Sequence, residues 1–184
     1  MASEQQQLLI AGRWLPAANH HSPLTTKFMS ATVGNQAPAF SLYDTEKNKV
    51  SLEDFKGQNL VVLFFPMAFT SVCTAELCSV RDSLSTYNGL NTAVVGISVD
   101  SPFTLGKFKE EQGLNFPLLS DFNKEACQAF GAYYDTFVLD LKGVSKRAAF
   151  VIDKEGKVRY AEVLESAKDL PDFSKIQQTL AGLQ

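Results

Sequence analysis

Cysteine is scarce in this chain: among 184 residues there are three cysteines, and no two of them have the C-x-x-C spacing. A secreted scaffold held together by disulfides would be shorter and far richer in cysteine, so that class is excluded. We therefore expect a reducing, cytoplasmic compartment, in which the cysteines are free thiols until some chemistry oxidises them.

Long apolar runs and a strong net charge are also missing. No run reaches the roughly 18 apolar residues typical of a membrane span. The formal net charge of -3 offers no basic surface for nucleic acid or for an anionic membrane. The opening residues "MASEQQQLLIAGRW" lack the basic start and apolar centre of a secretory signal. What is present, 45% hydrophobic and 20% charged residues, is enough to bury a full core.

The first thirty residues differ from the rest in composition. They contain a glutamine run, the only tryptophan, Trp14, and the pair His20 and His21, without sustained periodicity. The two histidines could bind a metal, but no other ligand lies nearby in the sequence, so we interpret the segment as a solvated tail. We predict an N-terminal extension over residues 1–30, a candidate for disorder, and one domain over residues 31–184.

Strand and helix patterns alternate from Pro38 onwards. Two short alternating segments around "TEKN" predict an N-terminal β-hairpin, and two nearly continuous apolar runs predict strands buried on both faces. Helical periodicity and capping residues separate the strands. The expected strands are 39–44, 48–52, 59–65, 92–99, 116–121, 147–153 and 157–163, and the expected helices 70–90, 101–113, 123–133 and 172–183. This order predicts an α/β fold with a mixed sheet and helices on both faces.

Cys73 lies where a predicted strand gives way to a predicted helix. The first turn of a helix has unpaired N–H groups and a partial positive charge, which favour a thiolate over a thiol. Thr70 could cap this helix or hydrogen-bond the sulfur, and Pro66 stiffens the loop. Cys73 also shares a helix face with Leu77 and Val80, as a small core residue would. Spacing alone leaves both interpretations open.

Cys78 follows Cys73 by five residues. In an ideal helix the two would lie about 140° apart around the axis, with a Cα separation of roughly 8–9 Å. A disulfide needs about 4.4–6.8 Å, so the helix would have to unwind for the two to bond. The alternative is that Cys78 is a partly buried, inert thiol. Cys127 is interpreted as a core residue, and the spacing of the cysteines does not fit a metal site.

The segment "FFPMAFTSVC" resembles the P-x-x-x-T/S-x-x-C signature of peroxiredoxins, the AhpC/TSA superfamily of cysteine-based peroxidases. The wording "FFPMAFT" looks most like the AhpE-type branch, whereas the Cys73–Cys78 spacing looks like the branch named for bacterioferritin comigratory protein. The resemblance implies a thioredoxin-like fold that needs no cofactor and no metal. It covers most of residues 32–182, through "VGNQAPAFSL", "VSLEDFKG", "VVGISVDSP", "FPLLSD", "AFGAY" and "RAAFVID".

The resemblance also implies a role for individual residues. Cys73 would be the peroxidatic cysteine, which attacks the terminal peroxide oxygen and becomes a sulfenic acid. Thr70 would hydrogen-bond the sulfur and the peroxide, and Pro66 would shield the sulfur from bulk water. Arg147 would reach the same pocket, with Glu76 orienting it. Considered alone, Arg147 would be an ordinary charge at a strand end and Glu76 a solvated helix residue.

The two branches imply different fates for the sulfenic acid. In one an external thiol reduces it; in the other a cysteine at the position of Cys78 resolves it into a disulfide, which we favour. Thioredoxin or a similar small dithiol protein would then restore the thiols. Expected substrates are hydrogen peroxide, organic hydroperoxides and peroxynitrite, and the family suggests a homodimer. A redox sensor that signals through mixed disulfides is the alternative; a thioredoxin-type reductase is disfavoured without C-x-x-C.

Overall fold

A computed structural model describes residues 31–183, so the predicted N-terminal extension, with Trp14, His20 and His21, lies outside the described residues. None of the described helices is both long and apolar enough to cross a membrane. The strands are β1 (Ser41–Asp44), β2 (Lys49–Ser51), β3 (Asn59–Phe64), β4 (Thr92–Ser98), β5 (Leu118–Ser120), β6 (Tyr133–Thr136), β7 (Lys142–Ser145), β8 (Ala148–Ile152) and β9 (Val158–Val163). The helices are α1 (Ser71–Asp82), α2 (Leu84–Gly89), α3 (Pro102–Gln112), α4 (Glu125–Ala129) and α5 (Phe173–Ala181), with 3-10 turns η1 (Leu52–Phe55) and η2 (Val138–Asp140).

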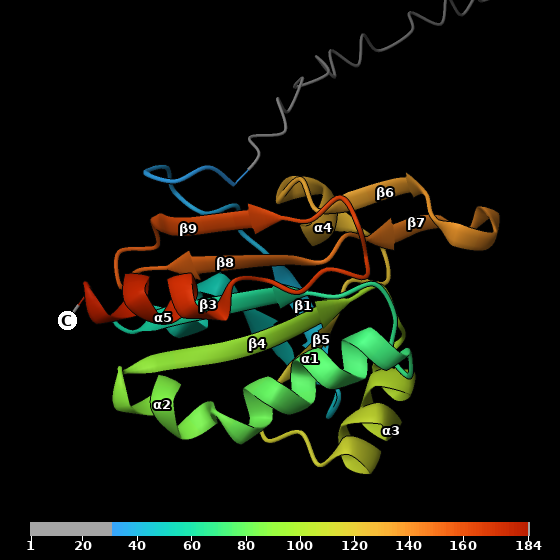
Figure 1. Cartoon of the computed structure of the whole chain (residues 1–184), viewed down its shortest axis with the longest axis horizontal. Coiled ribbons are helices and arrows are strands. Elements are labelled where there is room, and N and C mark those ends of the chain that lie inside the picture. The colour runs from blue at the N-terminus through green and yellow to red at the C-terminus, as the bar shows by residue number, and fades with distance from the viewer. Residues whose placement is uncertain (1–30, 184) are drawn as a thin grey trace, which may run out of the picture.

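Seven strands form one mixed sheet in the order β2-β1-β5-β4-β3-β8-β9 (Figure 1). Strands β3, β4 and β5 are parallel, whereas β1–β2, β1–β5, β3–β8 and β8–β9 are antiparallel pairs. In the β3–β8 pair Phe64 lies opposite Ala148, so the start of β8 is beside the end of β3. This register decides which residues can meet at that edge of the sheet.

Alternate residues of the central strand enter two separate cores. All six residues of β3 are buried. Val61 and Leu63 pack with apolar residues of α1, α2, α3 and α5 on one face. Leu60, Val62 and Phe64 pack on the other face with α4 and with strand β1. These cores confirm the predicted α/β, thioredoxin-like fold, which has a mixed sheet between helices and an N-terminal hairpin. In the described domain, α4 is the only α-helix in the core on the second face.

The single helix expected over residues 70–90 is in fact two helices. Ser83 leaves the helical conformation, with φ -102° and ψ 6°, and separates α1 from α2. Tyr87 is buried beyond this bend, whereas Leu84 is only partly buried. The predicted apolar face is thus real, but the helix bends so that its second part stays on the core.

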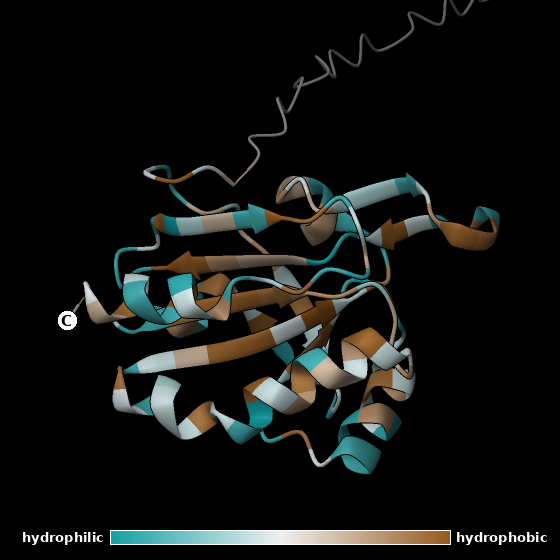
Figure 2. Ribbon diagram, viewed as in Figure 1, coloured by the Kyte–Doolittle hydropathy of each residue, from teal (hydrophilic) through white to brown (hydrophobic). Residues whose placement is uncertain are grey.

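Strands β6 and β7 form a hairpin that the sequence patterns did not predict. The hairpin projects from the body of the molecule (Figure 1), and its tip is apolar (Figure 2). Leu139 and Asp140 at the tip adopt positive φ angles of 60° and 58°. A turn in this conformation usually contains glycine, which residues other than glycine rarely replace. Because neither position is glycine or proline, the sequence lacks the usual turn signal.

The aromatic cluster on the second face gives a test of the core. The ring of Phe130 lies 5.0 Å from that of Phe150 and 5.3 Å from that of Phe64, measured between centroids. We expect Phe130→Ala to lower the free energy of unfolding by about 3–5 kcal/mol, measured by urea denaturation, because it leaves a cavity between these rings. The control Phe103→Ala, at a residue that is 72% exposed, should change it by less than about 0.5 kcal/mol. Equal losses in the two variants would contradict the assignment of this core.

Candidate active site

The loop between β3 and α1 is tied to the neighbouring strands. Its Ala68 amide donates to the Asp100 carboxylate (2.7 Å), which follows β4 and also accepts from the Ser98 hydroxyl (2.7 Å). The Ser145 hydroxyl of β7 donates to the Phe65 carbonyl (2.7 Å) at the start of the loop. The loop therefore lies at the carboxyl ends of the parallel strands, where open α/β sheets bind ligands.

Thr70 is the N-cap residue of α1, but its side chain does not cap the helix. The hydroxyl donates to the main-chain carbonyl of Met67 (2.9 Å), rather than contacting a first-turn amide or the Cys73 sulfur as expected from the sequence. Within the described chain the amides of Ser71, Val72 and Cys73 consequently have no acceptor. These N–H groups are available to an anion or a polar ligand. Contact between Thr70 and a bound peroxide stays a prediction.

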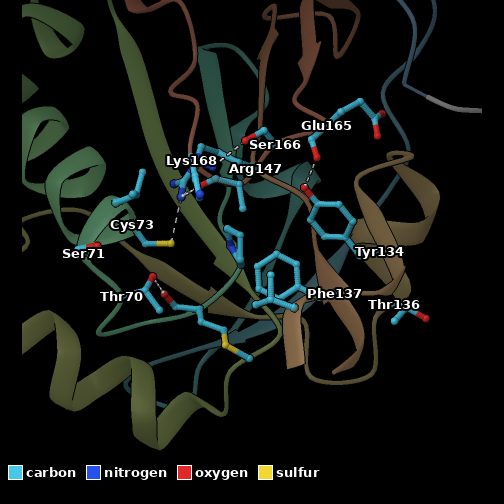
Figure 3. A pocket seen from close by; sticks show the side chains of 15 residues that line it. Thr70, Ser71, Cys73, Tyr134, Thr136, Phe137, Arg147, Glu165, Ser166 and Lys168 are labelled. Atoms are coloured by element: carbon cyan, nitrogen blue, oxygen red, sulfur yellow. Dashed lines mark hydrogen bonds between the residues drawn. The ribbon is translucent and has the colours of Figure 1, made fainter. Parts of the chain in front are cut away.

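Cys73 has the features of both a core residue and a reactive thiol, the two interpretations that the sequence left open. Its side chain is 1% exposed and packs in the core together with Leu77. Its sulfur nevertheless faces a pocket, where Nη2 of Arg147 donates to it at 3.3 Å (Figure 3). A fixed cation at this distance stabilises a thiolate relative to a thiol.

Arg147 is buried, so its interpretation as an ordinary strand-end charge is wrong. It is 1% exposed and immediately precedes β8, which the pairing of Phe64 with Ala148 places beside the active loop. Nη1 donates to the Glu76 carboxylate, and Nη2 donates to the Ala167 carbonyl (2.9 Å) as well as to Cys73. These contacts hold the guanidinium in one orientation.

Glu76 is likewise not a solvated helix residue. Its side chain is 0% exposed, and one carboxylate oxygen is bonded to Arg147 while the other, Oε1, has no partner within the described chain. Burial raises the pKa of Glu76 to about 7, although the adjacent Arg147 opposes this rise. The carboxyl group of Glu76 therefore titrates close to neutral pH.

The pocket above Cys73 has a volume of about 620 Å³. Pro66, Met67 and Thr70 form one side of it, and residues 165–168 close another. The β6–β7 hairpin contributes the remaining wall, which includes Tyr134 and Phe137 (Figure 3). The sequence patterns did not predict this wall. The cluster of aromatic and apolar residues in "YYDTFVLDL" was the signal that could have indicated it.

Two contacts tie the hairpin to the opposite side of the pocket. The Tyr134 hydroxyl donates to the Glu165 carbonyl (2.7 Å), and Nζ of Lys146 bonds both Glu165 carboxylate oxygens (2.7 and 2.8 Å). Lys146 also lies over the Tyr134 ring, 5.3 Å from its centroid. The pocket is thus a connected structure and not a gap between independent loops.

The other two cysteines lie away from this pocket. Cys78 is in the same unbroken helix as Cys73, and its sulfur lies 3.8 Å from Oε1 of Gln112. All three cysteines are free thiols. Cys127 is fully buried, as predicted for a core residue, and burial raises the pKa of its thiol, with Asp121 adding to the effect. Residues 31–183 contain no group of three His, Cys, Asp or Glu side chains that could hold a metal ion.

A thiol that faces a pocket beside a fixed cation can attack an electrophile and be oxidised, so this geometry points to cysteine-based redox chemistry. Residues 33–161 match the model of the AhpC/TSA family. The chain belongs to the AhpC/TSA family, whose members are peroxiredoxins, as its sequence suggested, and it is a thiol-dependent peroxidase.

Individual relatives agree with this assignment. A putative peroxiredoxin of Mycobacterium tuberculosis (strain CDC 1551 / Oshkosh) is 42% identical over 139 residues, which cover 74% of this chain and 88% of that protein. Peroxiredoxin Bcp of Escherichia coli (strain K12) is 38% identical over 128 residues, 69% of this chain and 82% of that protein. Among solved structures, peroxidoxin BcpB from Mycobacterium tuberculosis matches with a TM-score of 0.73 and 29% identity, covering 83% of this chain and 97% of that chain.

The buried carboxyl group predicts a pH dependence of stability. The pKa of Glu76 rises on folding from 4.5 to about 7, so its contribution to stability is complete below pH 4.5 and is lost as the pH rises through 7. We compare the free energy of unfolding of the wild type with that of Glu76→Gln. The advantage of the wild type should fall by a few kcal/mol between pH 4.5 and pH 7. Urea denaturation at a series of pH values measures the difference. A difference that stays flat or grows with pH would show that attraction to Arg147 outweighs burial.

Proposed function

We propose that Cys73 is the peroxidatic cysteine and that it reduces hydrogen peroxide and organic hydroperoxides. The observation that carries this proposal is the 3.3 Å contact between Arg147 Nη2 and the Cys73 sulfur on the wall of an open pocket. Glu76 occupies Nη1 of the same guanidinium, which keeps Nη2 directed at the sulfur. The carboxylate thus acts as a positioning group for Arg147.

The proposed first step is a two-electron oxidation of the sulfur. The Cys73 thiolate attacks the terminal oxygen of the peroxide, the S–O bond forms, and the O–O bond breaks. The departing alkoxide or hydroxide takes up a proton and leaves as an alcohol or as water, and Cys73 becomes a sulfenic acid. Negative charge moves from sulfur to oxygen in this step. Arg147 and the unpaired amides of the first turn of α1 are placed to stabilise it.

The size and lining of the pocket support the proposed range of substrates. Its volume of about 620 Å³ far exceeds the space that hydrogen peroxide needs. Met67, Phe137 and Val138 give it apolar walls that suit the organic part of a larger hydroperoxide. Arg147 and Lys168, both at this pocket, would also attract peroxynitrite, which is an anion.

We favour Cys78 as the resolving cysteine over reduction by an external thiol. Helix α1 has to unwind before the two sulfurs can meet. Its first turn has no side-chain cap and no acidic residue, so neither capping nor a favourable interaction with the helix dipole adds to the cost of opening. Thioredoxin or a similar small dithiol protein would then reduce the disulfide by thiol–disulfide exchange.

The compartment and the oligomeric state stay proposals. A reducing, cytoplasmic environment agrees with the free state of the three cysteines and would supply the dithiol reductant. A homodimer could use the apolar hairpin tip, where Val138 and Leu139 are 62% and 88% exposed.

A single-turnover experiment tests the role of Cys73. We expect reduced wild-type protein to consume about one equivalent of hydrogen peroxide rapidly, and Cys73→Ser to consume it only at the background rate, because the nucleophile is missing. Peroxide loss can be followed in a quenched-flow assay. Cys78→Ser is the matched control, since it removes a thiol from the same helix and should retain the rapid phase. Undiminished consumption by Cys73→Ser would overturn the proposal.

The fate of the oxidised sulfur is tested by mass spectrometry. After one equivalent of peroxide we expect a Cys73–Cys78 disulfide in the wild type, and a sulfenic acid at Cys73, trapped by dimedone, in Cys78→Ser. A sulfenic acid that persists in the wild type with Cys78 free would contradict the resolving role. It would leave the peroxidase role of Cys73 intact.

A further inference from the structure

Cys78 has polar neighbours that take no part in the attack of Cys73 on peroxide. Its thiol donates to Oε1 of Gln112 (3.8 Å), the last residue of α3, and this contact holds the side chain in place. Arg81, one turn beyond Cys78 on α1, donates from Nη1 to the main-chain carbonyl of Gln112 (2.5 Å). Helices α1 and α3 lie on the same side of the sheet (Figure 1), and one residue of α3 therefore contacts both the thiol and the guanidinium.

The charge of Arg81 is close to Cys78 and only partly balanced. Residues three apart on a helix are neighbours on its surface. Within the described chain the one ion pair of Arg81 is with Asp82 (Nε to Oδ1, 2.8 Å), whose side chain is exposed. The pKa of Arg81 is raised, first by its hydrogen bond to Asp82 and also by the nearby Cys78. A cation beside a thiol favours the thiolate, which is the form that attacks.

Arg81 also fixes the Cys78 end of α1 against the end of α3. Its side chain bonds the end of α3, and its main-chain carbonyl accepts from the Asn115 side chain (3.5 Å) beyond that helix. The first turn of α1, in contrast, has no side-chain cap. Opening would therefore begin at the Cys73 end of α1, while Cys78 stays in place against Gln112.

We propose that Gln112 positions Cys78 and that the Arg81 cation stabilises the Cys78 thiolate for the attack on oxidised Cys73. This inference rests on the proposed role of Cys78 as the resolving cysteine. The Cys78 thiol gives its proton to solvent, and the thiolate attacks the Cys73 sulfur. The S–S bond forms as the S–OH bond breaks, and the hydroxide released takes up a proton to become water. Cys78 is oxidised, and the sulfenic acid is reduced to the disulfide level.

The experiment measures the two chemical steps separately in Arg81→Met, Arg81→Lys and the control Arg159→Met. Arg159 pairs with Asp153 on another part of the sheet, so the control removes an arginine of similar exposure. Rapid quenching with dimedone and an alkylating reagent, followed by mass spectrometry, gives the rates of sulfenic acid and disulfide formation. We expect all variants to form the sulfenic acid at the wild-type rate. Disulfide formation should be about tenfold slower in Arg81→Met, largely restored in Arg81→Lys and unchanged in Arg159→Met.

Slower disulfide formation has a further consequence. Under excess peroxide Arg81→Met should accumulate more sulfinic acid at Cys73, because its sulfenic acid lives longer.

Disulfide formation at the wild-type rate in Arg81→Met, or no recovery in Arg81→Lys, would overturn the inference and leave the proposed function standing. If Arg81→Met does not fold, Gln112→Glu decides. The new carboxylate beside Cys78 should slow disulfide formation alone, and an unchanged rate would overturn the inference. If the wild type consumes peroxide but forms no disulfide, the proposed roles of both Arg81 and Cys78 are refuted. The peroxidase role of Cys73 then still stands.

Discussion

The active site depends on one buried guanidinium shared between two groups that can become anions. Arg147 binds the Glu76 carboxylate and the Cys73 sulfur, and nearly all of this cluster is removed from water. Burying a charge is unfavourable by several kcal/mol unless it is paired, and one cation cannot fully neutralise two anions. Glu76 relieves the conflict, because burial raises its pKa to about 7 and a protonated carboxyl group leaves Arg147 free to balance a thiolate.

The fold supplies this cluster from segments that are distant along the chain. Antiparallel pairing of β3 with β8 brings Arg147 beside the loop that leads to Cys73. The same loop is held by Asp100, which follows β4, and by Ser145 of β7, so two further segments of the chain fix its position. The two cores of the sheet stabilise this framework. The arginine can then be held in one orientation before any substrate arrives, which is the condition for electrostatic stabilisation of a transition state.

Local patterns in the sequence were enough for most elements but not for the site. The helix expected over residues 101–113 is α3, which begins after the N-cap Ser101 and ends before the C-cap Gly113, and the apolar run of β3 is buried on both faces as expected. The burial of Arg147 and Glu76 could not be derived locally, because each is neutralised by a residue about 70 positions away. Resemblance to a known family named both residues without indicating how they are buried. The β6–β7 hairpin went unnoticed because its turn uses Leu139 and Asp140 in a conformation that favours glycine.

With Cys78 as the resolving cysteine, as proposed, helix α1 would have to meet two opposing requirements during a catalytic cycle. For the attack on peroxide its first turn must be intact, since the unpaired amides and Arg147 act on a sulfur at a fixed place. For a disulfide the same turn must open, because Cys73 and Cys78 are about 8–9 Å apart between Cα atoms in a helix. Oxidation itself can connect the two states. A thiolate is attracted to Arg147 by its charge, whereas a neutral sulfenic acid is held only by hydrogen bonding, so the interaction that keeps the turn closed weakens once the sulfur has reacted.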